Sequence, residues 1–171
     1  MNCNIVKVCY EELIKVRSEL ENKYGHETMQ IMGKCIEGTD RLVHTLRNKG
    51  LKARPYQVWV LYEYYENCLE QCYEEHWLAV VEHNGYRIYL DPTFNQFQWA
   101  ICTKVMPKVY IGATLPNWFL NRKPGRDTLK KCGWHDYYNG YNFENKFDYW
   151  GYMKNPHNRE ILSMVNKIKI K

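Results

Sequence analysis

The dipeptide Asn84-Gly85 is the feature that most limits how this chain can fold. It stands between two runs of strand-forming residues, 77–81 and 86–90. Asn-Gly in this setting is typical of a two-residue β-hairpin turn, because both residues of such a turn need a positive φ angle. The sequence therefore predicts an antiparallel hairpin, and the short turn fixes which residues of the two strands lie opposite each other.

The hairpin register brings a histidine and an aspartate together. With a two-residue turn, Leu78 lies opposite Asp91, and His76 lies two residues before Leu78 on the same face of the sheet. His76 and Asp91 are then diagonal neighbours on one face, close enough for their side chains to interact. A slip of one residue would place them on opposite faces. We therefore predict a contact between His76 and Asp91.

A cysteine stands at the start of a predicted helix. Residues at positions 35, 39, 42 and 46 recur at helical spacing, with Gly33 before them and Gly50 after them. A helix N-terminus favours the thiolate form of a cysteine, and its free backbone N–H groups can stabilise an oxyanion. Cys35, His76 and Asp91 are therefore candidate catalytic residues, as nucleophile, general base and acid, and orienting group respectively.

The other expected elements are two helices, two strands and a long irregular region. The first helix runs from about Val8 to Tyr24 and is stopped by Gly25, and the closing helix runs from Asn158 to about Ile168. Strands are expected over 56–62 and 109–111, and residues 121–156 are predicted to be rich in loops because glycine, proline, asparagine and aromatic residues follow no clean period.

Four short motifs resemble a known family. They are Gly33-Lys34-Cys35 at a helix start, His76-Trp77 opening a strand, Asp91-Pro92-Thr93 closing the next strand, and the following Phe94-Asn95-Gln96-Phe97. The first three resemble the transglutaminase-like branch of papain-fold enzymes, and the fourth is similar to the Gln-Phe found after the acid in some small bacterial and phage members. The resemblance covers roughly residues 32–97.

This resemblance implies an α+β fold, a papain-like or transglutaminase-like core in which N-terminal helices pack on an antiparallel sheet. It also implies acyl transfer through a thioester on Cys35, with a glutamine side chain or peptide bond of a protein or peptide as substrate and no cofactor. Ile36 departs from the family, many of whose members carry tryptophan directly after the cysteine. Gln30 is a candidate for the usual upstream oxyanion helper by its position alone.

Two alternatives use the same residues differently. The chain could be a non-catalytic binding module of the same fold, such as a phage or mobile-element protein that blocks a host factor through its aromatic C-terminal half. The cysteines 68 and 72 and His76 are spaced by four residues, so a helix there would align three zinc ligands. The fourth ligand would be Glu75, Cys132 or His135.

Composition limits the remaining classes. The 171 residues fit one domain, 1–171, with an irregular C-terminal extension from about 121. No apolar run reaches the length of a signal peptide or membrane helix, so we expect a cytoplasmic protein whose seven cysteines are reduced.

The charged segments point to no particular partner. The net charge of +5 is mild, which makes nucleic acid an unlikely partner. Basic residues gather near aromatic ones, at Arg122, Lys123, Arg126, Lys130 and Lys131 beside Trp134, Tyr137 and Tyr138. This stretch and the acidic segment 63–75 are interpreted as solvated loops, although the acidic one could rim a cleft for basic peptides.

Overall fold

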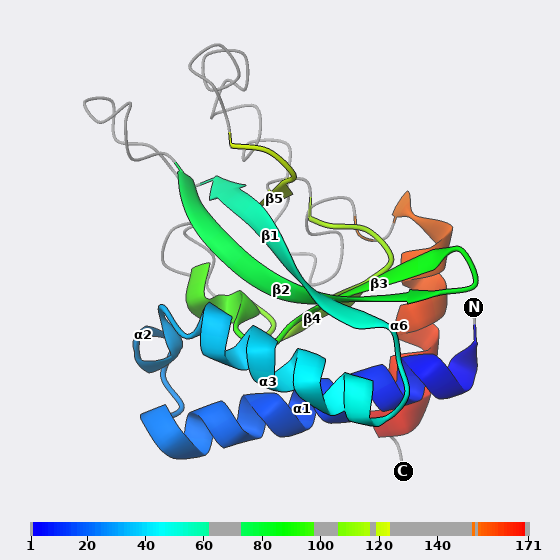
Figure 1. Cartoon of the computed structure of the whole chain (residues 1–171), viewed down its shortest axis with the longest axis horizontal. Helices are drawn as coiled ribbons and strands as arrows, with labels where there is room; N and C mark the ends of the chain where they lie inside the picture. Colours follow the sequence, from blue (N-terminus) through cyan, green and yellow to red (C-terminus); the bar gives the residue numbers. More distant parts are fainter. Residues whose placement is uncertain are drawn as a thin grey trace.

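The computed structural model describes residues 2–61, 73–97, 106–116, 119–123, 152 and 154–169. The elements follow in the order α1 (Cys3–Tyr24), α2 (Thr28–Ile31), α3 (Cys35–Asn48), β1 (Ala53–Leu61), β2 (Tyr73–His83), β3 (Tyr86–Asp91), the 3-10 helix η1 (Phe94–Phe97), β4 (Tyr110–Gly112), β5 (Phe119–Leu120) and α6 (Pro156–Lys169). The chain is α+β, as the sequence predicts, with helices on a curled antiparallel sheet (Figure 1).

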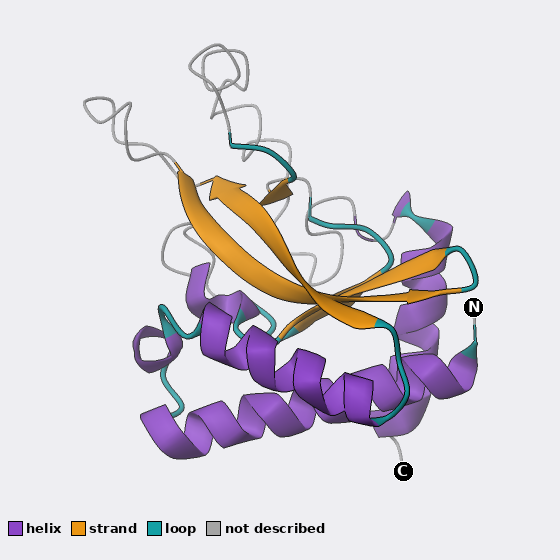
Figure 2. Ribbon diagram, in the orientation of Figure 1, coloured by secondary structure: helices purple, strands orange, loops and turns teal. Residues whose placement is uncertain are grey.

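Within the described residues, the sheet has five strands in the order β4-β3-β2-β1-β5, and every neighbouring pair is antiparallel. Helices α1 and α3 lie side by side, α3 contacts β1 and β2, and α6 packs against α1 (Figure 2). The last helix therefore brings the end of the chain back to the helical layer that the N-terminal half builds.

The hairpin forms in the predicted register. Asn84 and Gly85 have φ angles of 46° and 78°, the left-handed conformation that a two-residue turn of this kind requires. His83 pairs with Tyr86, and the ladder continues to the pair of Ala79 and Leu90. The strand parity on which the contact between His76 and Asp91 depends is thus confirmed.

Alternation along the strands divides the interior into two clusters. Leu78 and Val80 of β2 belong to one face and Ala79 and Val81 to the other, as the period of two residues requires. The aromatic cluster, on the first face, comprises Val58, Val60, Leu78, Val80, Tyr89, Phe94, Phe97, Met106, Tyr110 and Phe119. The helical cluster, on the second, joins Ala79 and Val81 to the buried sides of α1, α3 and α6.

Several of the expected elements have different limits. Helix α1 begins at Cys3 rather than near Val8, because the side chain of Asn2 caps it by accepting a hydrogen bond from the backbone N–H of Asn4. Helix α6 begins at Pro156 instead of Asn158, and β1 spans Ala53–Leu61 rather than 56–62.

Strand β2 takes in the end of the acidic segment. The sequence favours a loop or short helix over 63–75, but Glu74 pairs with Val60 and Glu75 with Trp59 in the β1–β2 ladder. Pairing with β1 thus makes these residues part of a strand although their composition is polar. The remainder of that segment, most of the predicted loop-rich region and the basic residues from Arg126 onward lie outside the described residues.

Among the helices that the structure describes, none is long and apolar enough to cross a membrane.

We predict that Gly85→Ala lowers the free energy of unfolding by roughly 1 to 2 kcal/mol, because an L side chain at φ 78° is strained. An added Cβ there meets no atom within 4 Å, so the substitution changes backbone strain without creating a clash. Urea denaturation measures the difference. A loss below about 0.5 kcal/mol, the range of an ordinary surface substitution, would contradict a turn of this type.

Candidate active site

His76 and Asp91 form a buried hydrogen bond between adjacent strands. The Nε2 atom of His76, on β2, lies 2.6 Å from Oδ2 of Asp91 at the end of β3. Their exposed fractions are 1% and 0%. The structure therefore brings together the histidine and the aspartate that the hairpin register predicts to meet.

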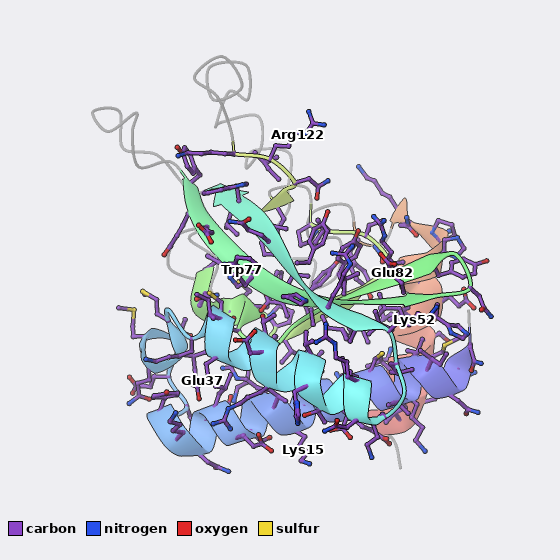
Figure 3. All side chains as sticks on the ribbon, in the orientation of Figure 1. Lys15, Glu37, Lys52, Trp77, Glu82 and Arg122 are labelled. Atoms are coloured by element: carbon purple, nitrogen blue, oxygen red, sulfur yellow. The ribbon has the colours of Figure 1, made fainter. Side chains whose placement is uncertain are left out.

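Cys35 completes the predicted trio. It is the first residue of α3, its exposed fraction is 9%, and it lies close enough to His76 for the two side chains to hydrogen-bond. No side chain caps this helix start, and the first N–H groups of a helix have no partner within it. Glu37 and Trp77, labelled in Figure 3, lie two residues after Cys35 and directly after His76, so they locate the start of α3 and the part of β2 that carries His76.

The surroundings of His76 act on its pKa in opposite directions. Burial disfavours the charged imidazolium, but the charge and hydrogen bond of Asp91, followed by those of Cys35, outweigh it and raise the pKa of His76 to about 9. The rings of Phe97 and Phe119 face the imidazole edge-on, with centroids 4.8 and 5.6 Å away. Two aromatic side chains that follow Asp91 in the sequence thus pack against the imidazole ring.

The loop after β3 holds the aspartate. Oδ1 of Asp91 accepts hydrogen bonds from the backbone N–H of Thr93, at 2.8 Å, and from its hydroxyl, at 3.1 Å. Because Oδ2 faces His76, both carboxylate oxygens have hydrogen-bond donors. The carboxylate is therefore fixed in position and cannot rotate without losing several bonds.

Gln96 is a residue of the site that sequence reasoning did not assign. Its Nε2 lies 3.0 Å from Nδ1 of His76 and 3.1 Å from the hydroxyl of Thr93, and its Oε1 accepts the backbone N–H of Gly33 at 3.2 Å. Asp91, His76, Gln96 and Thr93 thereby form a closed ring of hydrogen bonds. The only sequence signal was the Gln-Phe dipeptide of the family resemblance, which gives the residue no role.

Arg17 is a second residue that the sequence analysis missed. Its Nη1 donates to the backbone carbonyl of Pro92 at 3.1 Å and to Oδ1 of Asn95 at 2.8 Å, and its Nε donates to Glu21 at 2.7 Å. The side chain is 3% exposed. A signal was present, because position 17 continues the apolar face of the first helix, where a charged residue needs a buried partner.

Gly38 lets α3 approach the same loop closely. A Cβ at this position would lie 3.0 Å from Cγ of Pro92 and 3.0 Å from Cδ1 of Leu20. A larger residue would therefore require Leu20 or Pro92 to give by a few tenths of an ångström, where α3 approaches the loop that follows Asp91.

Two residues near Cys35 bear on the comparison with the resembling family. Gln30, considered as oxyanion helper by its position, takes part in the capping box of α2, where its Oε1 accepts the backbone N–H of Glu27 at 3.0 Å, and its role as oxyanion helper stays a prediction. Ile36, which stands where many members of the resembling family have tryptophan, is 58% exposed beside Cys35.

The zinc alternative fails at His76. This residue lies in a strand rather than a helix, so the spacing of four residues does not align it with positions 68 and 72. Cys68, Cys72, Cys132 and His135 lie outside the described residues. Among the residues that are described, no group of three histidine, cysteine, aspartate or glutamate side chains could hold a metal ion.

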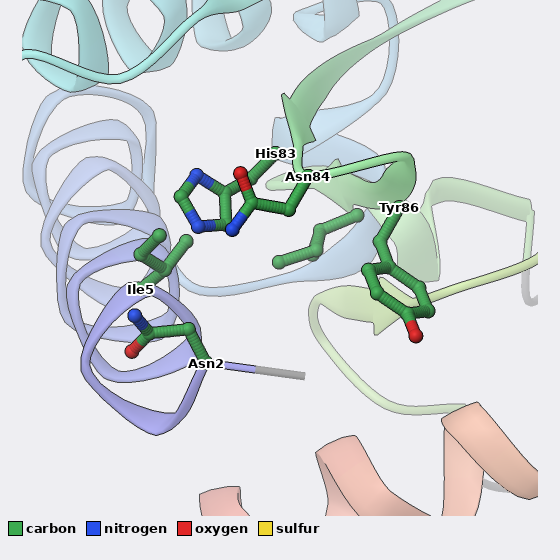
Figure 4. Close-up of a pocket in the computed structure, with 6 residues that line it drawn as sticks. Asn2, Ile5, His83, Asn84 and Tyr86 are labelled. Atoms are coloured by element: carbon green, nitrogen blue, oxygen red, sulfur yellow. The ribbon is translucent and has the colours of Figure 1, made fainter.

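A cavity at the other end of the hairpin is separate from this site. Its volume is about 210 Å³, and it is lined by Asn2, Ile5, His83, Asn84, Tyr86 and Ile88 (Figure 4). His83 is seven residues from His76 along β2, a distance of about 23 Å at the usual rise of a strand. The cavity therefore lies away from Cys35, His76 and Asp91.

Comparison with known families finds no family model that matches the chain, and comparisons with curated proteins and with solved structures find no match either.

We predict that Arg17→Met lowers the free energy of unfolding by roughly 3 to 5 kcal/mol, because it removes a buried cation from several fixed acceptors and from Glu21. The matched control is Arg54→Met, which removes an exposed ion pair with Glu82 and should cost at most about 1 kcal/mol. Chemical denaturation of both variants gives the comparison. Equal losses would contradict a structural role for Arg17 in this loop.

Proposed function

We propose that this protein is an enzyme that catalyses cysteine-dependent acyl transfer on a protein or peptide. The observation that carries the proposal is the position of His76, which contacts Asp91 through one ring nitrogen and lies within hydrogen-bonding range of Cys35. A nucleophile, a base and a group that orients the base are the parts that this chemistry needs.

In the first half of the reaction, Cys35 forms a thioester. The proton of Sγ passes to Nδ1 of His76, and the sulfur bonds to the carbonyl carbon of the substrate while the carbonyl π electrons move to oxygen. When the carbonyl re-forms, the C–N bond breaks and the leaving nitrogen takes the proton from Nδ1. Backbone N–H groups at the start of α3 are suited to stabilise the transient oxyanion.

In the second half, water or an amine displaces Cys35 from the acyl group. The water or amine gives a proton to Nδ1 of His76 and attacks the thioester carbonyl. The C–S bond then breaks, and the sulfur takes that proton back from Nδ1. Water gives hydrolysis or deamidation, and an amine gives a cross-link. Every proton moves between His76, Cys35 and the reactants, so the reaction as proposed needs no cofactor.

We also propose that the α+β fold of this chain is a papain-like or transglutaminase-like core. A helix that starts at the nucleophile and packs on an antiparallel sheet, whose adjacent strands carry the histidine and the aspartate, is the arrangement that the motifs resembling transglutaminase-like enzymes imply. This arrangement supports a papain-like or transglutaminase-like core. It favours the glutamine side chain or a peptide bond as the group attacked.

We predict that iodoacetamide at neutral pH alkylates Cys35 at least about tenfold faster than Cys3, because His76 can take its proton. Cys9 should not react, since burial raises the pKa of its thiol to about 12. His76→Ala should abolish the preference for Cys35, whereas His83→Ala, on the same strand but outside the site, should leave it unchanged. Peptide mapping by mass spectrometry measures each rate.

Equal rates at Cys35 and Cys3 in the unaltered protein would contradict the enzymatic proposal and favour the binding module. If Cys35 is selective, ammonia release from a glutamine-containing peptide separates deamidation from peptide-bond cleavage, with Cys35→Ala as the inactive control.

A further inference from the structure

One nitrogen of His76 has two hydrogen-bond donors near it. Asp91 faces Nε2, so Nδ1 is the nitrogen that must receive the proton of Cys35. Yet the side-chain amide of Gln96 lies 3.0 Å from that same nitrogen. A single lone pair on Nδ1 therefore serves both the resting hydrogen bond and the proposed proton transfer.

The partners of Gln96 fix which end of its amide faces His76. Its Oε1 accepts the backbone N–H of Gly33, and its Nε2 donates to the hydroxyl of Thr93, which in turn donates to Asp91. With the amide turned over, its NH₂ group would face the N–H of Gly33, and two donors would oppose each other. Gln96 thus presents an N–H to Nδ1.

An amide N–H can donate to Nδ1 only while that nitrogen carries no proton. The hydrogen bond therefore belongs to the neutral imidazole whose proton is on Nε2, facing Asp91. Protonation at Nδ1 must break it. A hydrogen bond that exists only in the neutral form stabilises that form, so Gln96 acts against the stabilisation of the imidazolium by Asp91.

We propose that Gln96 is a positioning residue that favours the neutral tautomer of His76, with Nδ1 unprotonated, against the charged form that Asp91 favours, and so limits how readily Cys35 loses its proton before a substrate is bound. The proposal rests on the proposed acyl transfer for its meaning, but the hydrogen bond and its effect on His76 can be measured without it.

In the part of the chain that the structure describes, the titratable groups around His76 come from three elements. Asp91 lies on β3, Cys35 on α3 and Glu74 on β2 itself. Burial raises the pKa of the Glu74 carboxyl, and the charge of His76 offsets part of that rise. The contacts from η1 and β5 that face the ring, apart from the uncharged amide of Gln96, are the rings of Phe97 and Phe119. Gln96 can therefore be altered without changing the local charge.

The test is the proton titration of His76 by NMR in a Cys35→Ala chain, where no thiol competes for Nδ1. Gln96→Met keeps the length of the side chain and removes the N–H donor. We expect it to raise the midpoint of His76 by about 0.5 to 1 pH unit, the shift that one hydrogen bond of ordinary net strength gives. Gln30→Met, the same substitution at an exposed glutamine of α2, should leave the midpoint unchanged.

An unchanged or lowered midpoint in Gln96→Met would overturn the proposal. A measurement without substitution at position 96 guards against misfolding of that variant. Overhauser contacts between the side-chain N–H of Gln96 and the ring of His76 should be present above the midpoint and weaken below it, and contacts equally strong on both sides would overturn the proposal.

These measurements separate two failures. Because Cys35 is absent from the titrated chain, they report on Gln96 whether or not the protein transfers acyl groups. If the midpoint rises as expected but Cys35 shows no selective alkylation in the unaltered chain, the proposed function fails and the role of Gln96 in setting the protonation of His76 stands.

Discussion

The buried hydrogen bond between His76 and Asp91 is the interaction on which the rest of the site depends. Neither side chain has appreciable access to water, and a buried polar group without a partner costs roughly 1 to 3 kcal/mol, more if it is charged. Each of the two therefore requires the other. Their contact exists only in one register of the β2–β3 hairpin, so the turn at Asn84 and Gly85 sets the geometry of a site at the far end of the strands.

The loop after Asp91 is fixed by contacts from both layers of the fold. Arg17 of α1 binds the carbonyl of Pro92 and the side chain of Asn95, while Gln96 reaches from the loop to Gly33, just before Cys35. The helix that begins at Cys35 and the strands that carry His76 and Asp91 are thereby tied to one short segment. Their relative position depends on hydrogen bonds as well as on apolar packing, and this restricts motion at the site.

Sequence reasoning reached the residues whose placement follows local rules. The turn chemistry of Asn84 and Gly85 gives the parity of His76 and Asp91, and helical periodicity places Cys35 at a helix start. Gln96 and Arg17 escaped because their partners lie 63 residues away at Gly33 and 75 residues away at Pro92, and only tertiary packing brings these together. Gln30 was considered by position alone, and its side-chain oxygen lies in the capping box of its own helix.

The proposed chemistry depends on one step, in which His76, held by Asp91, withdraws the proton of Cys35. The rate constant for alkylation of Cys35, measured from pH 5 to 10 in the unaltered chain and in Asp91→Asn, tests this step. We expect Cys35 to react at least about tenfold faster than Cys3 even at pH 6, where an ordinary thiol is almost fully protonated, and Asp91→Asn to remove this advantage. A profile for Cys35 that follows that of Cys3, or one that Asp91→Asn leaves unchanged, would contradict it.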